Sequence, residues 1–584
     1  MNIKDIKSPA DIKGLSVAEL DDIAAQMRDA ILRRTAAIGG HVGPNLASVE
    51  SIIAMHYVFD APKDKIVFDV SHQDFVHKML TGRVDGFIDP SAFGKIGEYI
   101  DPKESPEYDL FYAGHTSPSL SLSVGLAKAR ELLGEKHNIV VYIGDGALSG
   151  GEAFEGLDAA AALDCNFIVL LDDNQMAIAE DHGGIYEGLR QLRETAGTSD
   201  INLFKAFGFD YIYVAEGNDM QACIDAMRKV KDIDHPVVVH LNTQKGEGYA
   251  PAEKYREEFH YMAPYDIATG EPLDNDDSLD YSSFTRNYLL EKSKEMPELL
   301  VISSATPEAF GFMAEERKML GKQYIDVAIA EQTGVSVMAG AARGGAKVVY
   351  PVIASFLQRA YDQLVEDWAM DESPAVMLVL STGICGIPDQ THLGFWDVPM
   401  ITSIPDIIYL APANIEEYKA MFDWGLKQDS HKVAIRVPTY SMQHADGEVD
   451  TDYSDINRFK MVHRGKDVAV IAVGDFFVRG KEIVALLAEK GVDATLINPR
   501  FISGVDIDMM KSLEKDHHLV VTLEDGSVEG GFGQRVASVL GMSPLKVKNF
   551  GLKKQFVDRY NPNDLEKVYG LTTEQISADI LASM

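Results

Sequence analysis

The feature that most restricts the fold of this chain is the alternation of short β-branched apolar runs with longer helix-like stretches. Runs at 138–143, 347–352 and 467–473 have the length of buried strands, and the stretches between such runs are long enough for helices. The pattern predicts βαβ units, in which helices flank parallel-type sheets. Ligands of such sheets bind at the carboxyl ends of the strands, so the residues that follow these runs are the first site candidates.

Two stretches without apolar periodicity, 263–280 and 441–457, are rich in Asp, Gly, Pro and Ser and are interpreted as linkers. They divide the 584 residues into segments that each repeat the strand and helix pattern. We therefore predict three α/β domains, at 1–270, 278–445 and 457–584. Further strands are expected at 166–171, 324–330, 375–380, 493–497 and 519–523, and a helix at 151–163.

Composition narrows the class of ligand. The net charge of −36 repels nucleic acid and anionic lipid, so an anionic ligand needs a local positive site. The cysteines Cys165, Cys223 and Cys385 are too few for a disulfide framework or a zinc cluster. The apolar runs are strand-sized and the N-terminus has no apolar signal region. We expect a cytoplasmic protein that acts on small molecules.

The strongest motif is IGDGALSGGEAFEG at 143–156, followed by LLDDNQM at 170–176. Asp145 and Asn174 each follow a predicted strand, and a strand–turn–helix–strand unit of this length returns the chain beside its start. With the carbonyl of Met176 they supply half of an octahedral oxygen shell, which suits Mg²⁺ bound to a diphosphate. An ordinary Gly-Asp-Gly turn is the alternative for the first motif alone, but Asn174 after the second strand favours the metal site.

This spacing resembles the thiamine diphosphate signature, and further motifs extend the resemblance nearly from end to end. The chain is similar to the 1-deoxy-D-xylulose-5-phosphate synthase family of the transketolase-like group. DVSHQ and FLQRAYDQ favour this synthase over transketolase proper. The matching segments are GGHVGPNLASVE (39–50), FDVSHQDFVHKMLTGR (68–83), YAGHTSPSLS (112–121), KGEGYAPAEK (245–254), DVAIAEQ (326–332), SFLQRAYDQ (355–363) and DQTHLG (389–394).

The resemblance implies a transketolase-like thiamine diphosphate fold and a homodimer that uses Mg²⁺. It also implies decarboxylation of pyruvate and carboligation to glyceraldehyde 3-phosphate, which feeds isoprenoid and thiamine precursor synthesis. By the same resemblance Glu331 hydrogen-bonds the cofactor's aminopyrimidine ring, although a glutamate in a first helical turn is also common. Phe356 matches the aromatic residue that stacks on that ring; as an isolated residue it would be core.

The remaining site residues are implied by motif position. The catalytic set is Glu331, His41, His115, His260, His392 and Arg359. The cofactor contacts are His72, Gly114, His115, Thr116, Asp145, Gly146, Ala147, Asn174, Met176, Lys245, Tyr249, Glu331 and Phe356. The metal ligands are Asp145, Asn174 and Met176, and the residues expected to bind the substrate phosphate are Arg359 and Arg436.

Several acceptor-side positions depart from the family pattern. Where the family has an arginine, a tyrosine and a histidine, this chain has Ser381, Ile353 and Thr333. In the loop after Ser381, Pro388 stands where the family has an aspartate, and Asp389 is next to it. Thr439, Gln244 and Glu247 take the place of further basic residues, and the stretch 181–200 is short. We therefore expect intact cofactor chemistry and a weakened phosphate site.

Alternative functions follow from these departures. One is a related transketolase-like carboligase with a different aldehyde acceptor or ketose donor, and another is a catalytically silent paralogue that acts as a scaffold. A NAD-dependent oxidoreductase is disfavoured because no GxGxxG opens a helix. EGGFG at 529–533 lacks the GK[ST] ending of a phosphate loop, and we interpret it as a strand-to-helix turn in a C-terminal domain that supports dimerisation.

Overall fold

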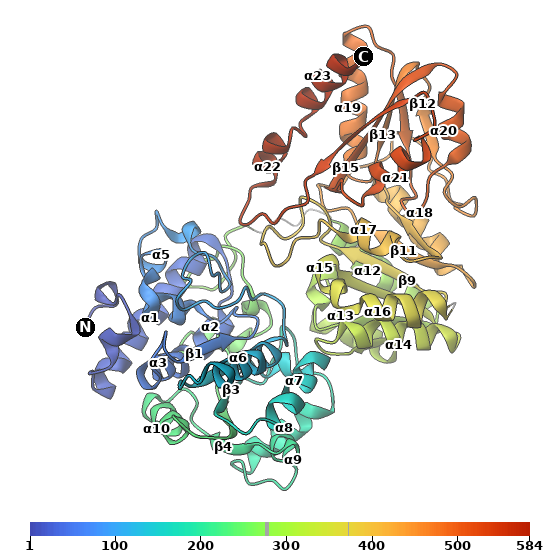
Figure 1. Ribbon diagram of the computed structural model, residues 1–584. Helices are drawn as coiled ribbons and strands as arrows, with labels where there is room; N and C mark the ends of the chain where they lie inside the picture. Colours follow the sequence, from blue (N-terminus) through green and yellow to red (C-terminus); the bar gives the residue numbers. More distant parts are fainter. Residues whose placement is uncertain (275–279, 372) are drawn as a thin grey trace. The chain divides into compact units, whose positions relative to one another are not determined.

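The computed structural model describes residues 1–274, 280–371 and 373–584. It divides into two compact units (Figure 1). Unit 1 comprises Met1–Asp277 and Ala328–Ala330, and unit 2 comprises Ser278–Val327 and Glu331–Met584. The boundaries of three domains at 1–270, 278–445 and 457–584 stay a prediction.

Unit 1 is built on a parallel sheet with the strand order β1-β2-β3-β5-β4. Every residue of β3 is buried, as expected for a central strand covered on both faces. The strands predicted at 138–143 and 166–171 are confirmed as β2 and β3, with ends that differ from the prediction by one or two residues. The strands are β1 Lys65–Phe68, β2 Ile139–Gly144, β3 Phe167–Asp173, β4 Asp210–Val214 and β5 Pro236–Asn242.

Alternate residues of these strands enter two separate cores. Tyr142 and Leu170 pack with α1, α3 and α10 on one face, and Val141 and Leu171 pack with α6, α7 and α8 on the other. This two-sided burial is why the strands are continuous apolar runs in the sequence. The helices are α1 Val17–Ile38, α2 Gly43–Ala47, α3 Val49–Val58, α4 Phe75–Lys78, α5 Asp85–Ile88, α6 Ser119–Leu133, α7 Gly151–Ala161, α8 Gly184–Glu194, α9 Leu203–Phe207, α10 Met220–Val230 and α11 Ala250–Lys254.

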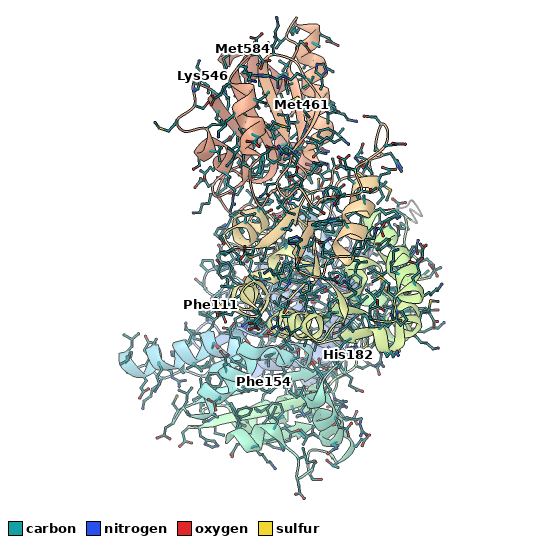
Figure 2. All side chains as sticks on the ribbon, turned by 90° about the vertical axis from the view of Figure 1, so that its right-hand side faces the viewer. Phe111, Phe154, His182, Met461, Lys546 and Met584 are labelled. Carbon is teal, nitrogen blue, oxygen red and sulfur yellow. The ribbon has the colours of Figure 1, made fainter. Side chains whose placement is uncertain are left out.

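Unit 2 carries two sheets. One is parallel, with the order β10-β11-β9-β8-β6-β7. The other has the order β12-β14-β13-β15-β16 and is parallel except for β12, which is antiparallel to β14. Met461 and Lys546, labelled in Figure 2, lie on its two edge strands. The strands are β6 Leu299–Ser303, β7 Tyr324–Asp326, β8 Lys347–Ile353, β9 Val376–Leu380, β10 Ile407–Leu410, β11 Lys432–Arg436, β12 Lys460–His463, β13 Asp467–Ala472, β14 Thr495–Asn498, β15 His517–Ser527 and β16 Lys546–Leu552.

One apolar core joins the two sheets of unit 2, since Tyr350 and Met377 of the first cluster with Ile471 and Val520 of the second. The helices are α12 Tyr281–Glu295, α13 Ala314–Leu320, α14 Glu331–Arg343, α15 Ala354–Leu357, α16 Tyr361–Gln363, α17 Asp397–Thr402, α18 Ile415–Leu426, α19 Phe476–Glu489, α20 Ile507–Leu513, α21 Phe532–Val539, α22 Pro562–Tyr569 and α23 Thr573–Ser583.

Two predicted strands need correction. The strand expected at 324–330 is only Tyr324–Asp326, because Ala328–Ala330 belong to unit 1. The strand expected from 493 begins at Thr495. The linker at 441–457 contains neither helix nor strand, and part of the linker at 263–280 lies outside the described residues.

The EGGFG segment is the turn between β15 and α21, as expected. No helix in the described ranges is long and apolar enough to cross a membrane.

Candidate active site

The carboxyl edge of β2 and β3 brings together the two loops predicted to bind a metal. The strands are paired in parallel up to Gly144 and Asp172, so Asp145 and Asn174 follow at the same edge. The backbone N–H of Gln175 donates to Oδ2 of Asp145 at 2.8 Å, and that of Gly146 donates to Oδ1 at 3.0 Å. Asp145 therefore holds the loop that carries Asn174.

Both predicted metal side chains are buried acceptors. Asp145 is 1% exposed and Asn174 is 7% exposed, and Oδ1 of Asn174 has no hydrogen-bond partner among the described residues. Burial, together with the charge of Asp181, raises the pKa of the Asp145 carboxyl well above its usual range. A cation would satisfy the unpaired amide oxygen and compensate the buried carboxylate. These residues fit a divalent metal ion.

The ligand set is mixed in character. Within the described ranges, no group of three or more His, Cys, Asp or Glu side chains is arranged to hold a metal ion. The candidate set instead combines a side-chain carboxylate, a side-chain amide and the backbone carbonyl of Met176. Met176 forms a short antiparallel bridge with Glu180. Oxygen ligands of this kind suit Mg²⁺ rather than zinc.

Asp181 is a residue that the sequence interpretation missed. Its Oδ1 is buried and has no hydrogen-bond partner in the described part of the chain, and burial, together with the charge of Asp173, raises its pKa to about 6. It lies in the short stretch before α8. No spacing rule marks it in the sequence, because its contact with the Asp145 edge depends on how that stretch folds back.

The predicted cofactor turn Gly114–His115–Thr116 is tied to the same edge. Next to it, the N–H of Ser117 donates to Oδ1 of Asp69 at 2.8 Å, and its hydroxyl donates to the carbonyl of Ala147 at 3.1 Å. A Cβ at Gly146 would lie 3.0 Å from Cβ of Ala177, so a side chain there would have to shift the segment that follows Asn174. The turn and the Gly146–Ala147 segment are thus brought together.

Three of the predicted histidines form a cluster in unit 1. The ring centroids of His41, His72 and His260 lie 5.2–5.4 Å apart. Burial lowers the pKa of both His72 and His260 well below the usual range, and the positive charge of Lys245 acts in the same direction. His72 and His260 are therefore neutral at pH 7 and each ring can both donate and accept a hydrogen bond.

Lys245 and Tyr249 have structural partners in unit 1. The Lys245 ammonium donates to the carbonyls of Ala177 and Ile178, at 2.7 and 3.2 Å, so it supports the segment after the Asn174 loop. The Tyr249 hydroxyl donates to the carbonyl of Ile267 at 2.8 Å. Their cofactor contacts stay a prediction.

Unit 2 brings four further predicted residues together as two pairs. Glu331 is the first residue of α14, is 2% exposed, and lies 3.4 Å from the Arg359 guanidinium. Burial raises the pKa of Glu331, and the charge of Arg359 opposes that shift. The ring of Phe356 is 5.4 Å from that of His392, edge to face.

Arg436 occupies a different environment from the one expected for a phosphate ligand. It is 3% exposed, and its guanidinium donates to Asp397 at 2.8 Å and to Asp525 at 2.6 Å. Two buried carboxylates already satisfy its charge. The phosphate contact of Arg436 stays a prediction, and this pairing argues against it.

Comparison with known proteins agrees with the fold. Residues 277–443 match the family described as "Transketolase, pyrimidine binding domain", and residues 457–576 match "Transketolase, C-terminal domain". The chain is thus of the transketolase-like class. Residues 3–202 and 195–243 match the family described as "1-deoxy-D-xylulose-5-phosphate synthase".

Relatives extend the match to the whole chain. The 1-deoxy-D-xylulose-5-phosphate synthase of Symbiobacterium thermophilum is 36% identical, covering 99% of this chain and 94% of that protein. The 1-deoxy-D-xylulose-5-phosphate synthase of Desulforudis audaxviator is 33% identical, covering 97% of this chain and 95% of that protein. A solved transketolase from Campylobacter jejuni is 16% identical over 97% of this chain and all of its own, with a TM-score of 0.45. The chain belongs to the 1-deoxy-D-xylulose-5-phosphate synthase family, whose members are thiamine diphosphate-dependent transferases of the transketolase type.

Proposed function

We propose that this protein is a 1-deoxy-D-xylulose-5-phosphate synthase. It decarboxylates pyruvate and joins the remaining two-carbon unit to the aldehyde of glyceraldehyde 3-phosphate, in the synthesis of isoprenoid precursors. The observation that carries the proposal is the unpaired, buried amide oxygen of Asn174 at the Asp145 edge, in a chain that matches relatives of that name over nearly its whole length.

The cofactors of the proposed reaction are thiamine diphosphate and Mg²⁺. When bound, thiamine diphosphate supplies the nucleophilic carbon that this chemistry requires. Asp145, Asn174 and the Met176 carbonyl would hold the cation, and its charge would in turn hold the diphosphate. The turn Gly114–His115–Thr116 and the Gly146–Ala147 segment are the parts of unit 1 that would contact the cofactor beside the metal.

Glu331 and the histidines would manage protons. Burial raises the pKa of the Glu331 carboxyl and so favours the protonated form, which is the form that would donate a hydrogen bond to the aminopyrimidine ring. Phe356 would stack on that ring. The neutral rings of His72 and His260 can pass a proton without first losing a charge.

The alternative is a related carboligase with a different aldehyde acceptor. It is favoured by one observation: Arg436 is paired with Asp397 and Asp525, while Ser381 supplies no charge where the family has arginine. Under this alternative the donor chemistry is unchanged and the acceptor is not phosphorylated.

A direct test is pyruvate-dependent release of CO₂ by the purified chain. We expect release that requires both thiamine diphosphate and Mg²⁺ and that rises when an aldehyde is added. Release that is independent of the added cofactors in metal-depleted, dialysed protein would contradict the proposal. We also propose a cytoplasmic homodimer, which sedimentation of the purified protein tests.

A further inference from the structure

A carboxylate reaches the predicted catalytic His41 from a segment that carries none of the predicted site residues. Oε2 of Glu98 lies 2.9 Å from Nδ1 of His41 and 3.3 Å from its backbone N–H. Gly40 admits this contact, because a Cβ there would lie 2.6 Å from Oε1 of Glu98. The approach of Glu98 therefore depends on a glycine next to the histidine.

Arg34 pairs with this carboxylate and helps to keep it charged. Arg34 is 2% exposed, lies 3.3 Å from Oε1 of Glu98, and its guanidinium stacks over the rings of Phe75 and Phe87 at 4.7 and 5.2 Å. Burial alone would raise the pKa of Glu98. The hydrogen bond from His41 and the charge of its protonated ring, with a smaller effect from the charge of Arg34, outweigh burial, and the pKa is lowered. Glu98 is an acceptor at neutral pH.

The backbone on both sides of Glu98 is fixed by a buried lysine. Nζ of Lys78 donates to the carbonyls of Gly97 and Tyr99 at 3.0 and 2.6 Å and to Glu104 at 3.0 Å. Glu104 in turn accepts the N–H of Gly97 at 2.7 Å. Glu98 is therefore held at its position without His41, as a pre-organised acceptor would be.

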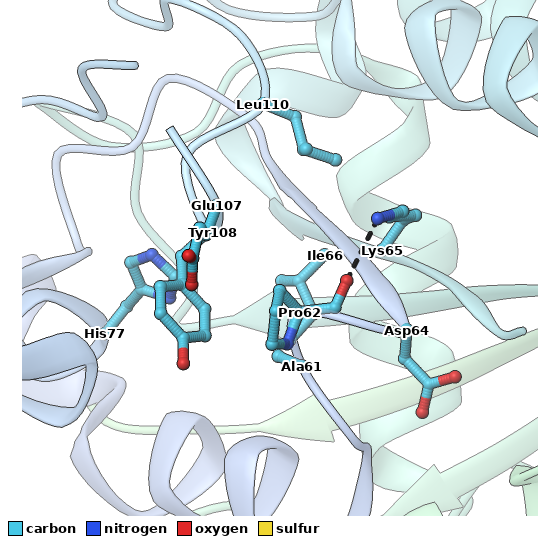
Figure 3. Close-up of a pocket in the computed structure, with 9 residues that line it drawn as sticks. All are labelled: Ala61, Pro62, Asp64, Lys65, Ile66, His77, Glu107, Tyr108 and Leu110. Carbon is cyan, nitrogen blue, oxygen red and sulfur yellow. Dashed lines mark hydrogen bonds between the residues drawn. The ribbon is translucent and has the colours of Figure 1, made fainter. Parts of the chain in front are cut away.

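The far end of this segment is also anchored. Asp109 accepts from the guanidinium of Arg83 and from Nε2 of His77, the latter at 3.0 Å, and from the N–H of Asp101 at 3.2 Å. Figure 3 shows His77 and Tyr108 beside the small pocket at this end. The segment 97–109 is thus tied at both ends to buried charged residues.

The geometry determines which nitrogen of His41 carries the proton. A carboxylate can only accept, so Nδ1 of His41 must donate to Glu98. In the neutral ring Nε2 then has a lone pair and can accept a hydrogen bond. Around the ring lie Tyr99 and Tyr261, with centroids at 5.8 and 5.1 Å, beside the histidine cluster.

We propose that Glu98 is a positioning residue that holds His41 in the Nδ1–H tautomer, so that Nε2 accepts a hydrogen bond from a hydroxyl of the acceptor aldehyde. The substrate class it selects is a hydroxyaldehyde rather than a simple aldehyde. The selection of substrate rests on the proposed function, whereas the tautomer of His41 does not.

The tautomer is tested on the ligand-free full chain by the ¹⁵N chemical shifts of the His41 ring. The wild type and Glu98→Gln, which keeps a carbonyl acceptor, should show the Nδ1–H form. Glu98→Ala should show a mixture of tautomers. Glu98→Leu fills the same space without an acceptor, and it provides the same test if Glu98→Ala does not fold. Glu107→Gln, at an exposed position on the same segment, is the control. Unchanged ring shifts in both variants without an acceptor would overturn the proposal.

The substrate class is tested with glycolaldehyde and acetaldehyde, which differ by one hydroxyl, each with pyruvate. We expect the wild type to prefer glycolaldehyde, and Glu98→Ala to reduce that preference in kcat/KM by roughly two- to tenfold, the value of one hydrogen bond. The loss with glycolaldehyde should exceed the loss with acetaldehyde, and Glu98→Gln should restore most of the preference. Equal losses with both aldehydes would overturn the proposal. A wild type that is inactive with every aldehyde would instead contradict the proposed function. The ¹⁵N chemical shifts of the His41 ring would still test the role of Glu98.

Discussion

At the scale of single residues, the candidate metal site rests on an amide oxygen without a donor among the described residues and on a buried carboxylate. The amide oxygen of Asn174 has no partner among the described residues, and the Asp145 carboxylate accepts the N–H groups of Gly146 and Gln175 while the charge of Asp181 acts against its ionised form. A buried amide oxygen without a donor and a buried carboxylate without a counter-charge both cost free energy in the empty protein. A bound cation removes that cost, so affinity for the metal and affinity for the diphosphate should be coupled.

We therefore predict that Asp145→Ala and Asn174→Ala each lower the affinity for thiamine diphosphate in the presence of Mg²⁺ by more than about 100-fold. Loss of an outer-shell partner alone typically costs 10–100-fold, and these variants remove a direct ligand. Titration calorimetry measures the effect. Gln175→Asn is the matched control, because the backbone rather than the side chain of Gln175 bonds Asp145. Near-normal binding in both alanine variants would show that the motif has been misread.

Glu331 should matter for turnover rather than for binding. Glu331→Gln keeps the size of the side chain and removes its ability to carry or share a proton, so we expect cofactor affinity to stay within about threefold while kcat falls by about 10²–10⁴-fold. Calorimetry and steady-state kinetics separate the two effects. The exposed Glu366→Gln is the control. Turnover of the Glu331→Gln variant at the wild-type rate would show that Glu331 has no catalytic role and is only a residue of the first helical turn.

At the scale of elements, the turn between β15 and α21 depends on a buried acid. Glu524 accepts the N–H groups of Phe532 and Gly533, both at 2.9 Å, and so caps the first turn of α21. Burial raises the pKa of Glu524 to about 8, although these N–H groups oppose the shift. The folded protein therefore binds a proton here that the unfolded chain releases near pH 4–5.

The direction of the pH dependence follows from the raised pKa. The contribution of Glu524 to stability is fully present below the pKa of the unfolded chain and is lost as the pH rises through about 8. We predict that the wild type loses more than about 1 kcal/mol from this group between pH 5 and 8, since one pKa unit corresponds to about 1.4 kcal/mol. Glu524→Gln, which mimics the protonated acid, should flatten the profile of thermal unfolding. A variant with the slope of the wild type would contradict this account.

The elements show how far the sequence determines the outcome. β2, α7 and β3 are predicted within about two residues, because they are buried on a regular period and are bounded by glycine and polar residues. The length of β7 is overestimated, because the apolar residues Ala328–Ala330 belong to the other unit and apolar character does not tell which core a residue joins.

The site divides in the same way. Asp145 and Asn174 are found by spacing, because one βαβ unit fixes the distance between them. Glu98 and Arg34 are missed, since they meet each other and His41 only through contacts between residues about 60 positions apart. No local pattern encodes such a contact.

At the scale of the whole molecule, charge bears on the choice of acceptor. The chain has a net charge of −36, and Arg436 is already neutralised by two carboxylates. A phosphorylated aldehyde therefore meets an unfavourable field and at least one fewer arginine than the family pattern supplies.

We predict that glyceraldehyde 3-phosphate is used with a weak apparent affinity and that unphosphorylated aldehydes compete well. Ser381→Arg should lower the KM for glyceraldehyde 3-phosphate by about ten- to a hundredfold, the value of a charge-assisted contact. Pyruvate decarboxylation should be unchanged. Ser381→Gln, long but neutral, is the control. Tight and selective use of glyceraldehyde 3-phosphate by the unmodified protein would contradict the weakened-site argument and leave the synthase assignment standing.

The most direct test of the synthase assignment is identification of the product. The purified protein is given thiamine diphosphate, Mg²⁺, ¹³C-labelled pyruvate and a mixture of glyceraldehyde 3-phosphate, glyceraldehyde and glycolaldehyde, and the products are resolved by mass spectrometry. We predict 1-deoxyxylulose 5-phosphate that carries the label of the two-carbon unit, together with labelled CO₂. Both products should be lost in Asn174→Ala. Labelled CO₂ with a product from the unphosphorylated aldehydes alone, or no carboligation at all, would contradict this prediction.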